Sequence, residues 1–181
     1  LTNGGQICTA HTRLVVQDSF KAPLLNKLKE ELEKLPFCND PIPEKDRGDR
    51  ALEDGMTDVV QPIVCESQHK KVLRFLDEAK SAGVEFLTGG NVPDAETVGN
   101  AGGYFIQPTV LVNVERDADV WQKEVFGPVL SVRTFSTEQE AVLEANSTAF
   151  GLASTVMSSD PAKAMRVANR IRAGAVYATS N

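Results

Sequence analysis

Cys8 is the residue whose type and setting best suit covalent chemistry. It follows Gly4, Gly5 and Gln6, and Arg13 comes five residues after it. A thiol at the end of a glycine-rich turn can be exposed, and the backbone N–H groups of such a turn can point at an anion that forms on a bound carbonyl. The pattern favours a nucleophilic cysteine that attacks a carbonyl carbon. The alternative is a structural cysteine, because free cysteine commonly packs as a small apolar side chain.

The same stretch resembles the active-site cysteine motif of the aldehyde dehydrogenase family. That motif has an apolar residue, three variable positions, Gly, Gln, any residue and Cys, with Arg five residues later; the matching residues are Leu1, Gly5, Gln6, Cys8 and Arg13. His11 departs from the motif, since small or hydroxyl residues are more usual there. The resemblance implies that Cys8 is the catalytic nucleophile.

A second stretch, residues 124–128, resembles the family's Glu-x-Phe-Gly-Pro motif. In the family the Glu hydrogen-bonds the nicotinamide ribose and the Phe lies against the nicotinamide, so the resemblance assigns these cofactor-binding roles to Glu124 and Phe126. The chemistry is suitable, because a carboxylate accepts hydrogen bonds from ribose hydroxyls and an aromatic side chain restricts where a ring can lie. The alternative is an acid at a helix end followed by a core Phe. Residues 104–109 and 150–156 resemble further family segments.

The resemblance implies oxidation of an aldehyde to a carboxylic acid with NAD or NADP as cofactor. In the family, the cysteine attacks the aldehyde to give a thiohemiacetal, whose oxyanion is held by the cysteine N–H and an upstream Asn. Hydride transfer then leaves a thioester, and an upstream Glu activates the water that hydrolyses it. Residues 3–8 and 122–130 are most similar to the betaine- and aminoaldehyde group. The upstream Glu and Asn would lie before residue 1, so the alternative is a non-catalytic binding or structural subunit derived from the family.

Composition limits the other functions. The 181 residues are 41% hydrophobic, which favours a folded domain, and the net charge of −6 argues against nucleic acid and anionic membranes as partners. Cys8, Cys38 and Cys65 are an odd, widely spaced set that predicts neither a disulfide framework nor a zinc site. A reducing intracellular compartment, cytoplasmic or organellar, is the simpler assumption. His11 and His69 are the only histidines, and we expect no bound metal.

Strand and helix patterns alternate along the chain around these residues. Strands are predicted over 13–17, 84–87, 129–135 and 173–177, with a strand-like stretch over 104–112 that a proline breaks, and the resemblance implies a strand over 150–156. Helices are predicted over 18–35, 67–82, 117–123, from about 136 and from about 160. Such alternation predicts an α/β fold, a mostly parallel sheet with flanking helices that is aldehyde dehydrogenase catalytic-domain-like by resemblance.

We expect residues 1–181 to be a truncated catalytic domain, with the nucleotide-binding domain and the oligomerisation strand of the family absent. Residues 39–58 are rich in Pro, Asp, Arg and Gly, and we predict a loop insertion there. A truncated two-domain fold exposes apolar surface, so we predict a homo-oligomer or association with another chain, besides a small-molecule aldehyde as the substrate.

Overall fold

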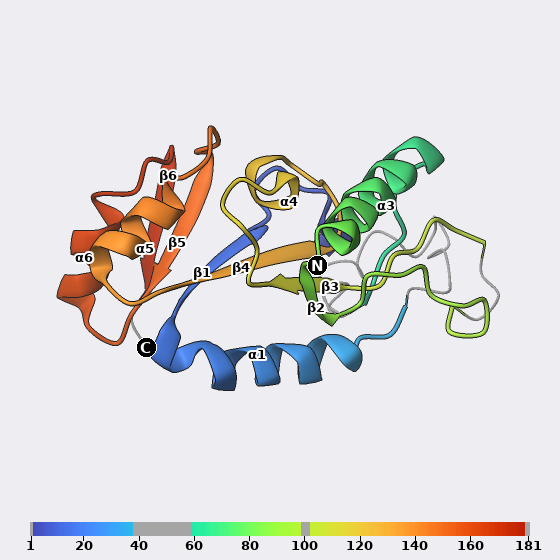
Figure 1. The fold of residues 1–181 in the computed structure, drawn as a ribbon, viewed down its shortest axis with the longest axis horizontal. Helices are drawn as coiled ribbons and strands as arrows, with labels where there is room; N and C mark the ends of the chain where they lie inside the picture. Colours follow the sequence, from blue (N-terminus) through green and yellow to red (C-terminus); the bar gives the residue numbers. More distant parts are fainter. Residues whose placement is uncertain (1, 38–58, 99–101, 180–181) are drawn as a thin grey trace, which may run out of the picture.

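The structure, a computed structural model, describes residues 2–37, 59–98 and 102–179. These residues form a four-stranded sheet with helices on both faces and a separate two-stranded sheet with one helix packed on it (Figure 1). Most strand pairs are parallel, which confirms the predicted α/β class. The predicted insertion over 39–58 and Cys38 lie outside the described residues.

The four-stranded sheet begins with the strand that follows the cysteine motif. Its order is β1 (Arg13–Gln17), β4 (Val129–Phe135), β3 (Thr109–Val112) and β2 (Glu85–Thr88). β1 and β3 both pair in parallel with β4, whereas β2 pairs antiparallel with β3. Every residue of β3 is buried, as expected for a strand covered on both faces.

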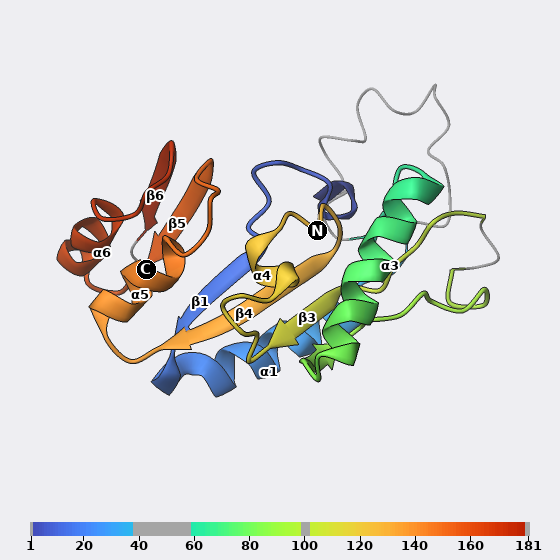
Figure 2. The same ribbon diagram turned by 45° about the horizontal axis from the view of Figure 1, so that its top comes forward.

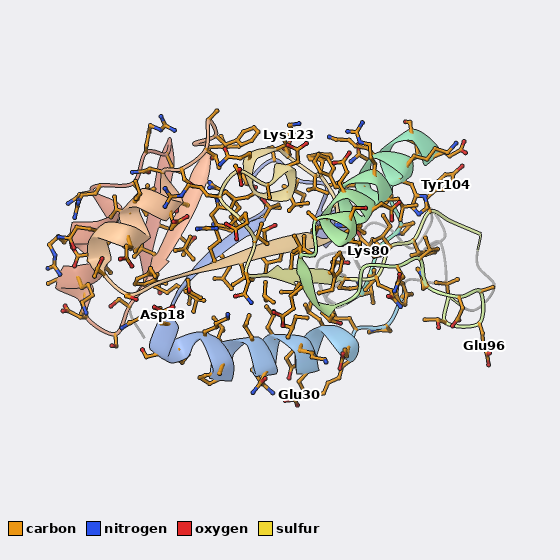
Figure 3. The ribbon with its side chains drawn as sticks, in the orientation of Figure 1. Asp18, Glu30, Lys80, Glu96, Tyr104 and Lys123 are labelled. Atoms are coloured by element: carbon orange, nitrogen blue, oxygen red, sulfur yellow. The ribbon has the colours of Figure 1, made fainter. Side chains whose placement is uncertain are left out.

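Two amphipathic helices cover the opposite faces of this sheet. α1 (Asp18–Glu33) lies along one face and α3 (Glu66–Ser81) along the other (Figures 1 and 2). Leu25 of α1 packs against strand residues on its side, and Phe75 of α3 belongs to the larger cluster on the other side. Glu30 lies on the outer side of α1, away from the sheet (Figure 3). Each helix therefore buries an apolar face against the sheet and leaves a polar face outside.

α4 (Asp119–Gln122) is a short helix between β3 and β4 that buries Trp121. The indole Nε1 donates to the Ser147 hydroxyl at 2.9 Å. The guanidinium of Arg133 lies 5.6 Å from the indole ring, within the range of a cation–π contact. Trp121 therefore fixes the segment that leads into Glu124.

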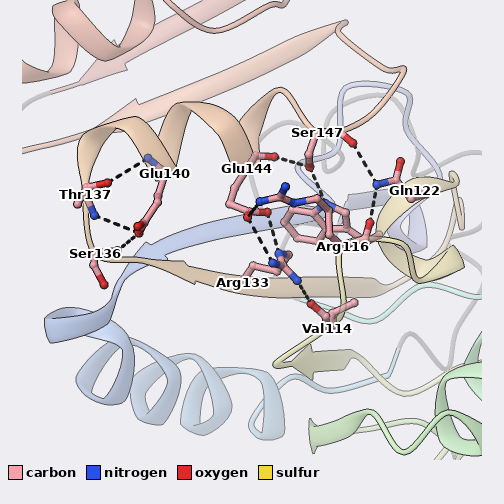
Figure 4. A network of polar contacts seen from close by, with 10 residues as sticks. Val114, Arg116, Gln122, Arg133, Ser136, Thr137, Glu140, Glu144 and Ser147 are labelled. Carbon is pink, nitrogen blue, oxygen red and sulfur yellow. Dashed lines mark hydrogen bonds and ion pairs between the residues drawn. The ribbon is translucent and has the colours of Figure 1, made fainter.

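A buried carboxylate holds α5 (Glu138–Ala145) against β4 (Figure 4). Glu144 is only 5% exposed, and it accepts hydrogen bonds from Arg133 Nε at 2.8 Å and from Arg116. Arg133 also donates to the Val114 carbonyl. Burial acts to raise the pKa of Glu144, but the bonds from Arg116 and Arg133 outweigh it and lower this pKa below its ordinary value.

In the C-terminal part, β5 (Ala153–Met157) pairs in parallel with β6 (Ala175–Thr179) to form the second sheet, and α6 (Pro161–Ala168) packs on this sheet. Both predicted helix starts are confirmed: Thr137 caps α5 in a capping box, and Asp160 accepts hydrogen bonds from the first turn of α6. The two strands begin slightly later than the sequence pattern predicts.

The strand-like stretch over 104–112 gives a much shorter strand in the structure. Only Thr109–Val112 forms β3, and Tyr104 makes an isolated bridge with Ile63. Pro108 has no backbone N–H to donate, so the regular ladder begins directly after it.

His69 is half-buried, with Nε2 3.2 Å from the Phe105 carbonyl oxygen. Within residues 2–37, 59–98 and 102–179, no three His, Cys, Asp or Glu side chains are grouped to hold a metal ion. No helix in these ranges is long and apolar enough to span a membrane.

Candidate functional site

The backbone before Cys8 is wound the opposite way to an ordinary helix. Asn3, Gly4 and Gly5 have φ angles of 55°, 62° and 75° in a short 3-10 segment, Thr2–Gly5. Most residues avoid this left-handed region because Cβ approaches the backbone, whereas Gly adopts it freely and Asn tolerates it. The Asn-Gly-Gly sequence is therefore what allows the turn that ends at Cys8.

Gln6 is buried and fixes this turn to the segment before α3. Its Nε2 donates to the Asn3 carbonyl at 2.9 Å, and its Oε1 accepts from the Val64 N–H at 3.0 Å. A buried amide costs free energy unless both its oxygen and its nitrogen are hydrogen-bonded, and here they are. The motif Gln thus serves the shape of the loop, which the sequence alone did not reveal.

Cys8 is exposed in a turn closed by the hydrogen bond from Ala10 N–H to the Ile7 carbonyl at 3.0 Å. Among the described residues, no acceptor is bonded to the Cys8 backbone N–H. Three residues further on, His11 Nε2 lies 3.0 Å from the Thr155 hydroxyl of β5. The nucleophile predicted from sequence is therefore accessible, with its own N–H free to bind an anion.

The second motif forms the segment between α4 and β4. Glu124 is exposed and Phe126 is half-buried, with a φ of 58° that is unusual for an aromatic residue. Gln68 of α3 donates through Nε2 to the Phe126 carbonyl at 2.8 Å and to the Val125 carbonyl at 3.0 Å. Sequence reasoning missed Gln68, although its position four residues before the buried Val72 places a polar amide on the apolar side of α3.

The two motifs, more than a hundred residues apart in sequence, meet backbone to backbone. A Cβ added to Gly5 would lie 2.6 Å from the Gly127 carbonyl carbon and 3.0 Å from Pro128 N, closer than atoms normally approach. Gly127 in turn lies on Val72 of α3, where an added Cβ would be 2.7 Å from Val72 Cγ2. Glycine at both positions therefore allows the loop before Cys8 to pack against the backbone that follows Phe126.

Arg13 supports this site from within the fold. Its guanidinium lies 5.2 Å from the Trp121 ring, and burial lowers its pKa below the ordinary value. Its Nη1 is buried without a hydrogen-bond partner among the described residues. The motif Arg therefore packs β1 against α4.

Cys65 is a second exposed thiol, just before α3. Its Sγ lies 3.2 Å from the Ser67 hydroxyl. A hydrogen bond from Ser67, with a smaller contribution from the Gln68 backbone, lowers the pKa of Cys65 below its ordinary value. Because the thiolate is the reactive form, Cys65 will compete with Cys8 for thiol reagents.

Comparison with known proteins places these features in context. The chain matches the model of the Aldehyde dehydrogenase family over residues 1–181. It is 40% identical to "Aminoaldehyde dehydrogenase 1, peroxisomal" of Pisum sativum and 36% identical to "Betaine aldehyde dehydrogenase, chloroplastic" of Beta vulgaris. Each alignment spans 173 residues, which is 96% of this chain and 31% of the relative.

The chain is also similar to solved structures of betaine aldehyde dehydrogenases. A crystal structure of betaine aldehyde dehydrogenase from Staphylococcus aureus in complex with NAD+ superposes with a TM-score of 0.82 at 33% sequence identity. The match covers 98% of this chain and 32% of that protein. The chain therefore spans about a third of the length of the relatives it matches.

Proposed function

Because the chain belongs to the aldehyde dehydrogenase family, we propose that it supplies the nucleophile and one wall of the cofactor site for NAD(P)-dependent oxidation of an aldehyde to a carboxylic acid. The observation that carries the proposal is the backbone contact between Gly5 and Gly127. This contact brings the loop that leads to an exposed thiol, Cys8, against the segment that carries Glu124, which is exposed, and Phe126, which is half-buried.

Cys8 begins the proposed reaction. Its thiolate attacks the aldehyde carbon, a C–S bond forms, and the carbonyl π pair moves onto oxygen to give the thiohemiacetal oxyanion. The Cys8 N–H, which has no acceptor among the described residues, donates one hydrogen bond to that oxyanion. Loss of hydride from the same carbon leaves a thioester, and attack by water releases the acid and returns the thiol.

Glu124 and Phe126 are proposed to form the wall for NAD or NADP, which accepts the hydride when bound. The donor set fits: the exposed carboxylate of Glu124 can accept from two ribose hydroxyls, and the half-buried Phe126 offers an aromatic surface to the nicotinamide. The fixed backbone of both residues limits the positions open to the ring.

The water-activating carboxylate and the second oxyanion donor are proposed to lie on segments outside this chain, which spans about a third of its relatives. The substrate is proposed to be a betaine-type or amino aldehyde, since the similar proteins carry those names. The same names include a peroxisomal and a chloroplastic protein, which supports an intracellular, reducing location.

Aldehyde protection of Cys8 tests the proposed nucleophile. A Cys65→Ser background removes the competing thiol, and iodoacetamide labelling is then read by peptide mass spectrometry. We expect betaine aldehyde to slow labelling of Cys8 severalfold, because the sulfur is occupied in the thiohemiacetal, while labelling of Cys65 in the native chain stays unchanged. In parallel, NAD+ reduction is followed by absorbance.

Each outcome of this pair of assays separates the hypotheses. Turnover that Cys8→Ala abolishes and Cys65→Ser retains supports the complete reaction in this chain. Protection without turnover supports Cys8 as the nucleophile of a site whose base lies on another segment. The absence of both protection and turnover would contradict the proposal. It would favour a non-catalytic binding or structural subunit.

We also expect the protein to associate with another copy of itself or with another chain, through the sheet formed by β5 and β6. Met157 and Tyr177 are 72% and 62% exposed, and the register pairs Thr155 with Tyr177 and Met157 with Thr179, so both apolar side chains lie on one face of the sheet. We expect sedimentation velocity to show a dimer or larger species whose fraction rises with concentration. Met157→Lys should reduce that fraction, whereas Val92→Lys, at a loop position, should not. A monomer at high concentration would contradict this expectation.

A further inference from the structure

Gln68 lies in the first turn of α3. Its side-chain amide contacts the backbone carbonyls on both sides of the Phe126 Cα, in the proposed cofactor wall. Gln68 Nε2 donates to the Val125 carbonyl at 3.0 Å and to the Phe126 carbonyl at 2.8 Å. A primary amide has two N–H donors on one nitrogen, so a single side chain can serve both acceptors. We propose that Gln68 is a positioning residue that sets the direction in which Phe126 and Glu124 face a nicotinamide cofactor; this inference rests on the proposed function.

The two carbonyls belong to the two peptide planes that flank the Phe126 Cα. The orientation of the plane before a Cα and of the plane after it together fix its φ and ψ, since each plane is rigid. By holding both, Gln68 determines the backbone conformation of Phe126, whose φ is 58°. The left-handed backbone conformation is unfavourable for an aromatic residue. Contacts with the rest of the protein are therefore needed to favour this conformation over an extended one.

We call the two hydrogen bonds from Gln68 to the Val125 and Phe126 carbonyls the Gln68 clamp. Other residues on the same face of α3 support it. Val72 lies four residues after Gln68, hence on the same side of α3, and contacts Gly127 directly. The segment just before α3 holds the nucleophile loop, through the bond from Val64 N–H to Gln6. One rigid helix and its lead-in therefore set the positions of both halves of the site.

The clamp can be tested on this chain with two variants of matched length. Gln68→Met keeps the length of the side chain and removes the donors, and Gln68→Glu places a carboxylate against two carbonyl oxygens. Gln139→Met, at an exposed position of α5, is the control. Carbonyl ¹³C shifts and ¹⁵N order parameters are recorded across residues 125–127, and the Kd for NADH is measured by fluorescence titration.

In both Gln68 variants we expect the carbonyl shifts of Val125 and Phe126 to change. The order parameters of residues 125–127 should fall from about 0.85 towards about 0.6, as for a flexible backbone. The Kd for NADH should rise about tenfold, while resonances of β4 stay in place to show that the fold is intact. The control should match the native chain in all three measurements.

Two results would overturn the proposal: native shifts and order parameters at residues 125–127 in Gln68→Met, or a mobile segment whose affinity for NADH equals that of the native chain. If the native chain fails to bind NADH at all, this contradicts a cofactor wall that binds the nucleotide in this chain alone. The Gln68 clamp is then decided by the loop measurements alone, so the two failures are distinguishable.

Discussion

Alanine at position 5 is expected to destabilise the protein by about 3 kcal/mol or more, and to separate the cysteine loop from the cofactor wall. Gly5 has a φ of 75° and lies against the Gly127 carbonyl, so an added methyl group meets backbone atoms that have no alternative rotamer. The cost combines left-handed strain with a steric overlap. Urea denaturation measures the free energy of unfolding, and the Kd for NADH reports the cofactor wall.

Gly83 provides the matched control. Its φ is 74°, nearly that of Gly5, but an added Cβ would have no atom within 4 Å. Gly83→Ala therefore carries only the backbone strain, about 1 kcal/mol, with no change in affinity for NADH. Equal losses of stability in the two variants would show that the contact between the two motifs contributes nothing, which would remove the main support for a joint site.

Glu144→Ala is expected to reduce the free energy of unfolding by about 3–5 kcal/mol, because it leaves the partly buried Arg133 without its carboxylate partner. The control is Glu31→Gln, which removes an exposed carboxylate that pairs with Lys27 on α1, and its cost should be far smaller because solvent screens this pair. A loss for Glu144→Ala no larger than that of the control would contradict the structural role of this pair.

The pH dependence of the same pair gives an independent check. Because the hydrogen bonds from Arg116 and Arg133 outweigh burial and lower the pKa of Glu144, the folded state binds a proton there less readily than the unfolded chain. The contribution is fully present above the unfolded pKa of about 4.3 and is lost as pH falls through the lower folded pKa. Stability measured from pH 7 to pH 3 should therefore fall less steeply in Glu144→Ala than in the native chain.

Local patterns in the sequence predicted most of the secondary structure. β1 and β4 lie where their apolar runs indicate, and helices begin close to positions 136 and 160 as predicted, with Thr137 and Asp160 as their caps. These features depend on contacts within a few residues, which a sequence displays directly. The stretch over 104–112 contains a proline that breaks the strand pattern, and the structure shows that only the part after Pro108 pairs as a regular strand.

The family, the α/β class and the turn at Cys8 could be predicted from the sequence alone, because they follow from residue types at fixed spacing. The contacts that hold the site together became visible in the folded structure. The contact of Gly5 with Gly127 and the bonds of Gln68 to the Phe126 segment join residues far apart in the chain. No local spacing encodes such contacts, since they arise when α3 packs on the sheet and brings the two loops to one surface.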